Sequence, residues 1–151
     1  MTRYLVLGAF LAIVLGGGMA IGYTTRPGAW FAALAKPSFN PPGWLFAPAW
    51  TILYVLIAIA GWRTFLREPI GLAMAVWTLQ LVLNFLWSPT FFGAHRPDAA
   101  LFVIAALLAS IVAFIAIRWS VDRTAALLFL PYAAWVIFAT ALNAAIWQMN
   151  R

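Results

Sequence analysis

Long stretches without a charged residue or histidine divide this chain into segments. They lie between Arg3 and Arg26, Lys36 and Arg63, Glu68 and His95, Asp98 and Arg118, and Arg123 and Arg151. Each is about 20 residues or longer, which at a helical rise of ~1.5 Å per residue matches a hydrocarbon core of roughly 30 Å. The pattern predicts five membrane-spanning helices, at approximately residues 4–24, 44–64, 70–92, 98–118 and 124–148. With an odd number of spans, we expect the two termini on opposite sides of the membrane.

The connection between the first two helices, residues 25–43, is much longer than the other three. Proline and glycine recur in it, and such segments form loops. It also carries Trp30, Phe31 and Phe39, which makes it too aromatic for a solvated linker. A long loop in a compact domain is usually either functional or disordered, and the aromatic content favours a packed lid over one end of the bundle.

The composition leaves little for a water-facing surface. Of 151 residues, 66% are hydrophobic and 8% are charged, whereas a soluble domain carries roughly 25% charged residues. Lipid must therefore be the solvent of most of the surface, and we predict an all-α integral membrane protein with a single domain, residues 1–151. The net charge of +6 comes from basic residues at segment ends, as expected for headgroup anchors. Because they form no patch, we expect membrane lipid and not nucleic acid as a partner.

Several kinds of chemistry are disfavoured by the residues that are missing. The chain has no cysteine, which excludes disulfides and cysteine-ligated metal centres. The acidic residues Glu68, Asp98 and Asp122 stand at predicted helix ends, whereas ion-coupled transport normally uses an ionisable group at membrane depth. The only histidine, His95, falls in a short loop, so we expect neither a catalytic triad nor a metal site.

Small residues recur at every third or fourth position in two of the predicted helices. They are Gly8, Ala12, Gly16 and Ala20 in the first helix, and Ala105, Ala109, Ala113 and Ala116 in the fourth. Such stripes let helix backbones approach closely in lipid. We expect them to pack the bundle internally, and a homodimer seam is the alternative.

Two prolines fall inside predicted spans. Pro89 is near the end of the third helix and Pro131 is in the first third of the fifth. Each removes an amide donor and clashes with a carbonyl one turn earlier, so a kink is expected. A kink between packed helices can open a cavity, although spans also tolerate proline without one.

Tryptophans and amides share helix faces. Trp77, Gln80, Asn84, Trp87 and Phe91 lie on one face of the third helix. An amide facing lipid would be unsatisfied, so we expect Gln80 and Asn84 to point inward, and the aromatic residues beside them to line the same interior. Asn143 in the fifth helix follows the same rule.

Two groups of tryptophans have different expected roles. Trp62, Trp119 and Trp147 stand at helix ends beside arginines, which is typical of the aromatic belt at a membrane interface. Trp50 and Trp135 have no cationic neighbour and share faces with small or polar residues, which favours a pocket lining. Flat aromatic walls suit a planar apolar ligand such as a porphyrin, and suit a sterol less well. Lys36 and Arg26 in the lid would contact either a ligand carboxylate or lipid headgroups.

Four runs of sequence carry a resemblance to a known family. They are KPSFNPPGW at residues 36–44, PAWTILY at 48–54, QLVLNFLWSP at 80–89 and PYAAW at 131–135. In their order and spacing they resemble the tryptophan-rich sensory protein/translocator protein family, and the resemblance covers the whole chain. It implies a five-helix bundle, commonly dimeric, that binds porphyrins, sterol-like lipids and benzodiazepine-type drugs beneath the first loop.

The resemblance also implies roles for individual residues. Trp50 and Trp135 match paired pocket tryptophans linked to porphyrin binding and to the light- and oxygen-dependent breakdown of protoporphyrin IX, so they are the candidate catalytic residues. The predicted ligand-binding residues are Trp30, Trp44, Phe46, Trp50, Tyr54, Asn84, Trp87, Phe91, Trp135 and Asn143. Trp147 stands where the mammalian sterol-recognition pattern has a tyrosine, which argues against tight cholesterol binding.

The sequence therefore predicts a membrane receptor or scavenger for porphyrins. The ring would stack between the second and fifth helices, with Asn84 and Asn143 fixing its orientation, and any enzymatic role would be slow photo-oxidation of the ligand. The alternatives are a facilitator that moves tetrapyrroles or sterols across the membrane, and a regulatory membrane partner. No tightly bound cofactor is expected. We expect a bacterial envelope membrane, or the mitochondrial outer membrane if the protein is eukaryotic.

Overall fold

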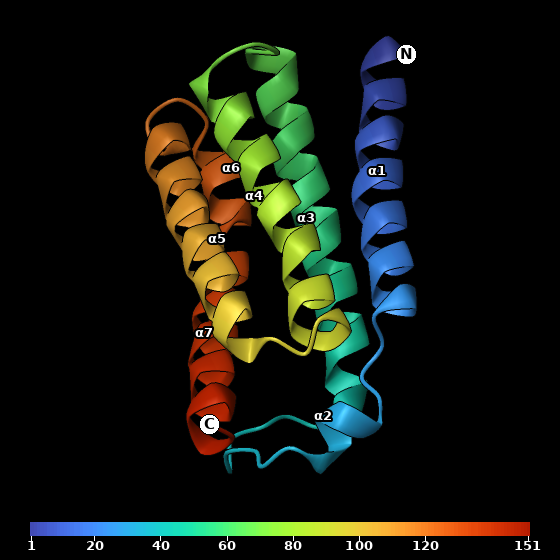
Figure 1. Ribbon diagram of the computed structural model, residues 1–151. Helices are drawn as coiled ribbons and strands as arrows, with labels where there is room; N and C mark the ends of the chain where they lie inside the picture. Colours follow the sequence, from blue (N-terminus) through green and yellow to red (C-terminus); the bar gives the residue numbers. More distant parts are fainter.

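Five long apolar helical segments form a bundle in the computed structural model, which describes residues 1–151 (Figure 1). The spans are α1 (Thr2–Thr24), η1 with α3 (Gly43–Leu45 and Phe46–Arg67), α4 with the π-helix η2 (Leu72–Ser88 and Pro89–Gly93), α5 (Pro97–Arg118), and α6 with α7 (Arg123–Leu128 and Leu130–Met149). The short helix α2 (Ala29–Ala33) lies in the first loop. The prediction of an all-α integral membrane protein with five spans is confirmed, and the termini lie at opposite ends of the bundle.

The side chains on the outside of the bundle are largely apolar. Phe102 is 80% exposed, and Ile13 and Leu72 also project from the surface. In water this surface would be unfavourable, but in a bilayer it contacts hydrocarbon. The interior in turn holds the amides Gln80 and Asn84. Amides facing lipid would lack hydrogen-bond partners. Because both side chains are buried, the prediction that they point inward is confirmed.

Glycines set the closest contacts between helices. Gly18 of α1 lies against the ring of Tyr54, and a Cβ added at Gly18 would overlap that ring. Gly61 of α3 faces the indole of Trp77 in the same way. In lipid, apolar surfaces gain little by meeting each other, so close backbone approach and van der Waals packing hold helices together.

The small-residue stripes do not pack the bundle internally, and that expectation is wrong. Gly8 and Gly16 of α1 are exposed, and a Cβ at either position would meet no atom within 4 Å. The same helix instead turns Val14 and Gly18 toward the bundle. The reason is that the rings opposite α1 need the space beside Gly18. On α5, Ala105, Ala109 and Ala116 are exposed as well.

Both intramembrane prolines alter the helix that contains them. At Pro89 the third span changes to π geometry, and Ala94 N–H donates to Pro89 O at 2.8 Å. The last span is interrupted at Phe129, two residues before Pro131, where φ is −88° and ψ is −8°. As a result α6 packs closely against α3, whereas α7 packs against α5 and touches α3 little. The fifth predicted helix is therefore two helices with a break between them.

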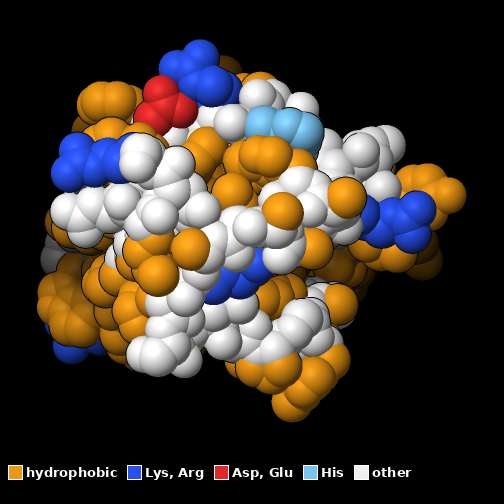
Figure 2. Space-filling model, turned by 60° about the horizontal axis from the view of Figure 1, so that its bottom comes forward, with side chains coloured by type: hydrophobic (Ala, Val, Ile, Leu, Met, Phe, Trp, Pro, Cys, Tyr) orange, Lys and Arg blue, Asp and Glu red, His pale blue; other side chains and the backbone are white.

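The first loop lies across the end of the bundle opposite the N-terminus (Figure 1). Trp30 in α2 stacks on His95 with ring centroids 4.3 Å apart and an interplanar angle of 6°. Asn150 holds the loop from the other side, because its side chain accepts from Ala35 N at 2.9 Å and donates to Ala35 O at 2.8 Å. At this end the basic side chains stand apart among apolar and backbone atoms (Figure 2). The loop is packed, as the aromatic content predicted.

Candidate functional site

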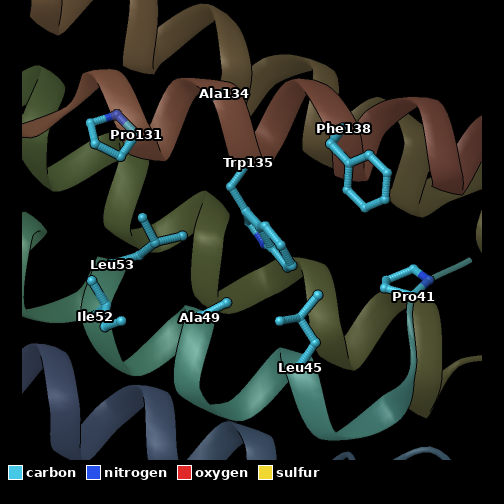
Figure 3. A pocket seen from close by; sticks show the side chains of 9 residues that line it. All are labelled: Pro41, Leu45, Ala49, Ile52, Leu53, Pro131, Ala134, Trp135 and Phe138. Atoms are coloured by element: carbon cyan, nitrogen blue, oxygen red, sulfur yellow. The ribbon is translucent and has the colours of Figure 1, made fainter. Parts of the chain in front are cut away.

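An apolar cavity of about 580 Å³ lies between α3 and α7 beside the first loop (Figure 3). Its walls are formed by Pro41, Leu45, Ala49, Ile52, Leu53, Pro131, Ala134, Trp135 and Phe138. The volume falls in the range of roughly 300–1,000 Å³ that is usual for small-molecule sites. This cavity is the candidate functional site.

The break at Phe129 explains why the cavity exists. Because α7 turns toward α5 after this residue, α3 and α7 do not close on each other along the lid side of the bundle. Ala49 of α3 (Figure 3) and Ala134 of α7 both line the gap, and their small side chains leave it unfilled. Trp135 reaches from α7 across this space toward α3.

Trp135 is the centre of an aromatic group in the cavity wall. Its ring lies 6.3 Å from Trp50 at 84°, 5.9 Å from Phe46 at 79°, and 5.8 Å from Phe138. Edge-to-face pairs at these distances are favourable. Trp50 packs in turn on Tyr54 at 5.5 Å. The structure therefore brings Trp50 and Trp135 together across α3 and α7, but only Trp135 lines the cavity. Trp50, Phe46 and Tyr54 lie behind it.

The indole N–H of Trp135 has no hydrogen-bond acceptor although it is buried. Most buried polar groups in proteins are paired, and each exception calls for an explanation. The unpaired group thus distinguishes Trp135 from Trp77, whose N–H donates to Ile57 O at 3.0 Å.

The cavity opens sideways from the bundle. Ile52 is 61% exposed, and Pro131 and Ala134 on the opposite wall are also exposed. These residues lie within the spans, so the mouth faces the hydrocarbon of the bilayer. A hydrophobic molecule dissolved in the membrane can reach the site without crossing the aqueous lid.

A buried hydrogen-bonded chain supports the bundle behind the cavity. Tyr54 OH donates to Asn84 Oδ1 at 3.3 Å, and Asn84 Nδ2 donates to Tyr132 OH at 2.7 Å. Tyr132 OH then donates to Gln80 Oε1 at 2.8 Å. The chain links α3, α4 and α7. Asn84 is thus bonded to protein groups and is not among the lining residues of the cavity.

Several other predicted ligand-binding residues form a second aromatic group under the lid. Phe91 is buried between Trp87, at 5.2 Å, and Trp30, at 5.9 Å. Trp87 N–H donates to Asn143 Oδ1 at 2.9 Å, and Asn143 Nδ2 donates to Pro97 O at 2.9 Å. These side chains fill the lid end of the bundle and satisfy each other's polar groups.

Trp44 and the two lid cations lie away from the cavity. Trp44 is 73% exposed. Lys36 Nζ donates to Leu34 O at 3.1 Å and lies 4.6 Å from the ring of Phe31, while Arg26 lies over Tyr23 at 4.7 Å. The structure therefore places these three predicted contact residues on the outside of the lid or against it.

Some lining residues were missed by the reasoning from sequence. Pro131, Ala134, Trp135 and Phe138 follow the spacing i, i+3, i+4 and i+7, which marks one helix face. That face includes Phe138. Asn143, which was predicted to bind ligand, lies under the lid instead. The signal was present in the spacing, but choosing between two faces that share Trp135 required the positions of α3 and the loop.

The wall offers packing and stacking rather than coordination. The cavity lining contains no titratable side chain, and no three His, Cys, Asp or Glu residues come together anywhere in the molecule. A ligand here would be held by aromatic and aliphatic contacts.

Comparison with known proteins adds to this geometry. The sequence profile described as the TspO/MBR family matches residues 9–148. Protein CrtK of Rhodobacter capsulatus is 41% identical over 145 residues, which cover 93% of this chain and 89% of that protein. The tryptophan-rich protein TspO of Chlorobaculum tepidum is 37% identical, with 93% and 95% covered. The translocator protein of Sus scrofa is 36% identical, with 96% and 85% covered.

Proposed function

The chain belongs to the TspO/MBR family, and from this membership we propose that it is a membrane receptor or scavenger for porphyrins such as protoporphyrin IX. The site is the cavity between α3 and α7. One observation carries the proposal: Trp135 stands in the wall of an apolar cavity of about 580 Å³ with Trp50 packed against it at 6.3 Å. A flat macrocycle can stack on the indole while its edges contact Leu45 and Phe138.

The shape and polarity of the cavity support a flat apolar ligand. The lining is almost wholly apolar, so it favours an apolar ligand that enters from the hydrocarbon of the bilayer. Aromatic side chains add roughly 0.5–1.5 kcal/mol per ring pair beyond the area that they bury.

A dark titration with protoporphyrin IX tests the proposal. The purified protein in detergent is titrated in the absence of light, and binding is followed by the absorption band of the porphyrin. We expect saturable binding near micromolar ligand, which corresponds to about −8 kcal/mol. A Trp50→Phe, Trp135→Phe double variant should bind at least tenfold more weakly.

A matched variant keeps this test specific. Trp119→Phe, Trp147→Phe also removes two indoles, but both lie against arginines at helix ends and away from the cavity. This control should bind as the unchanged protein does. Equal and unsaturable uptake by all three proteins would mean that the porphyrin only partitions into the micelle, and the proposed site would be abandoned.

The finer proposal concerns light. When bound porphyrin is excited, dioxygen adds across the double bond between a bridging carbon and the adjacent pyrrole carbon. That carbon–carbon bond breaks, the ring opens, and each of the two carbons keeps one oxygen atom as a carbonyl. Trp50, in edge-to-face contact with Trp135, is the candidate group that gives an electron to the excited ring and takes it back once dioxygen has added, so that no further oxidant or reductant is consumed. Trp50→Phe should leave dark binding nearly intact and slow the loss of porphyrin under illumination. Breakdown at an unchanged rate would remove Trp50 from this role.

A second candidate function is facilitated movement of hydrophobic molecules. The observation that favours it is the lateral mouth of the cavity at Ile52 and Pro131, which gives access from the bilayer. Liposomes that contain the protein should then transfer porphyrin faster than empty liposomes. A larger side chain at the mouth, introduced by Ala134→Phe, should slow the transfer of porphyrin. Equal transfer rates with and without protein would reject this function.

We also propose that the protein forms a homodimer through the exposed stripe of α1. Gly8 and Gly16 leave open space on the outer face of the helix, and small residues of this kind let two helices approach closely. Gly8→Leu, Gly16→Leu should shift the protein toward the monomer in analytical ultracentrifugation. An unchanged oligomeric state would exclude this face.

A further inference from the structure

A second cavity lies at the end of the bundle opposite the lid. It has a volume of about 210 Å³ and is lined by Arg3, Trp62, Arg63, Leu66 and Arg67. Arg3 belongs to the first turn of α1, and the other four belong to the last turns of α3. Three guanidinium groups thus converge on one small space at the level where the spans end.

A buried carboxylate orders two of these arginines. The side chain of Asp122 is only 2% exposed. Arg63 donates to it twice, from Nη2 at 2.9 Å and from Nε at 3.1 Å. Nε of Arg67 lies 3.4 Å from the same carboxylate, and Ala125 N–H also donates to it. Asp122 therefore sits beneath the arginines as their support, with its oxygen atoms occupied.

The third arginine is placed by its backbone. Trp62 Nε1 donates to Arg3 O at 2.7 Å, which ties the start of α1 to the end of α3. The guanidinium group of Arg3 lies 5.8 Å from the ring of Trp62 and makes neither a hydrogen bond nor an ion pair with a protein group. A guanidinium carries five N–H donors in a planar fork. Most of the donors of Arg3 and Arg67 are thus free to face a ligand.

The charge in this cavity is not balanced by the protein. Three arginines line it and one carboxylate, Asp122, pairs with them. The lid end differs. There Arg96 pairs with Asp98 at 2.8 Å, and Arg26, Lys36 and Arg151 each lie singly against one aromatic ring. Only the cavity at the N-terminal end combines several free guanidinium groups with a hollow between them.

We propose that this cavity binds the phosphate group of an anionic glycerophospholipid. Guanidinium forks match phosphate oxygens in pairs, and basic pockets between spans are suited to acidic headgroups. The cavity opens where headgroups lie, at the ends of the spans. Leu66 in its wall is half-exposed and apolar, which suits the glycerol and the start of an acyl chain. This combination favours a lipid over a free phosphate ion.

The site can be tested by counting bound lipids. The full-length protein in detergent is incubated with an equal mixture of phosphatidylglycerol and phosphatidylcholine, and retained lipids are identified by native mass spectrometry. We expect phosphatidylglycerol to bind at least tenfold more tightly than phosphatidylcholine, or about 1.4 kcal/mol. The test variant is Arg3→Gln, Arg67→Gln, which leaves the paired Arg63 and Asp122 in place to preserve the fold. It should lose this preference.

A matched variant and a competitor complete the design. Arg26→Gln, Arg151→Gln removes the same charge from the lid end and should keep the preference. Millimolar inorganic phosphate should not displace the lipid. Equal retention of the two lipids, or equal loss in both double variants, would overturn the proposal, since only overall charge would then be acting. Displacement by inorganic phosphate would also overturn it and would assign the cavity to a free ion. None of these outcomes depends on porphyrin binding.

Discussion

The two ends of the bundle are held together in different ways. The closed half runs from the N-terminus to the chain of Gln80, Asn84 and Tyr132, and in it α6 packs on α3. Ion pairs join its segments, and Arg118 is 1% exposed with a bond to Glu68 at 3.3 Å. The open half runs from that chain to the lid. Its contacts are mainly aromatic, and it contains the cavity between α3 and α7.

The difference shows how a small membrane protein can keep an open site. Apolar contact between helices contributes little in lipid, so directional polar contacts and close backbone approach hold spans together. The ion pairs between segments lie in the closed half, whereas the open half has uncharged bonds such as those of Asn143. Because contacts on both sides of it hold the helices in place, the cavity can remain unfilled without the bundle coming apart. Each prediction below alters a contact in one half or at the boundary between them.

The largest effect is expected from filling the contact between α1 and α3. Gly18→Ile would drive a side chain into the ring of Tyr54, and overpacking of this kind costs about 3 kcal/mol. The free energy of unfolding, measured by SDS titration in mixed micelles, should fall by this amount. Because Tyr54 also packs on Trp50, porphyrin binding should weaken as well.

The control is another glycine of the same helix. A side chain at Gly22 would meet no atom within 4 Å, so Gly22→Ile should change the free energy of unfolding by less than about 0.5 kcal/mol. Equal losses in the two variants would show that isoleucine disturbs the helix itself. The contact between Gly18 and Tyr54 would then not be what holds α1 in place.

The next effect concerns the ion pair of the closed half. Asp122→Asn keeps an N-cap residue for α6 but removes the charge that pairs with Arg63. Removing one member of a buried pair costs about 3–5 kcal/mol. Because Arg63 is 31% exposed, we expect a loss nearer about 2 kcal/mol. The comparison is Asp98→Asn at the lid end, whose pair with Arg96 is exposed. Asp98→Asn should leave the free energy of unfolding at neutral pH almost unchanged. A larger loss of this free energy than in Asp122→Asn would mean that the ion pair at the lid end stabilises the bundle more than the pair in the closed half.

The same residue predicts a pH dependence. Burial acts to raise the pKa of the Asp122 carboxyl, but hydrogen bonds from Arg63 and Ala125 and the charges of Arg63 and Arg67 hold this pKa below its ordinary value. The unfolded chain has a pKa near about 3.9. The stabilisation is therefore complete above that pH and is lost as the pH falls toward the lower folded-state pKa. Unfolding measured across this acid range should show a smaller loss in Asp122→Asn.

A third prediction addresses the chain that separates the two halves. Tyr132→Phe removes the hydroxyl that joins Asn84 to Gln80 and leaves two buried amide atoms unpaired. Interhelical hydrogen bonds in membranes are worth about 0.6 kcal/mol on average and at most about 1.7, so we expect a loss of about 1 kcal/mol. Tyr23→Phe, at an exposed ring, is the control. If porphyrin binding falls while stability is unchanged in Tyr132→Phe, the chain belongs to the ligand site rather than to the scaffold.

The spans were predictable from sequence because their cue is local. Whether a stretch without charge can cross a bilayer depends on its own length and composition. Trp50 and Trp135 are in contact, but only Trp135 lines the cavity, so the prediction that both line a pocket stays a prediction for Trp50. The outward position of Gly16 was not predictable, since α1 has small residues on more than one face. Which face turns inward depends on rings supplied by α3 and α4.

The extent of the cavity was out of reach for a related reason. Phe138 and Ala134 line it because α7 leaves α3 after the break at Phe129. A proline in a span predicts a kink but not its direction, which is set by the neighbouring helices. The basic cavity at the other end is similar. Its arginines are separated in the sequence, and only the folding of α1 against α3 brings Arg3 to Arg67.

The smallest effect on stability, and the sharpest test of the open half, is expected at the lid. Asn150→Ala removes both hydrogen bonds that hold the backbone of Ala35. These bonds are exposed, so the free energy of unfolding should change by less than about 0.5 kcal/mol. If the lid covers the ligand, dissociation of protoporphyrin IX measured by stopped-flow should nevertheless become several-fold faster. Gln148→Ala removes a neighbouring exposed amide that makes no such bond and should leave the rate unchanged. Because the mouth at Ile52 faces the bilayer, an unaltered rate in Asn150→Ala would mean that the ligand leaves sideways between α3 and α7.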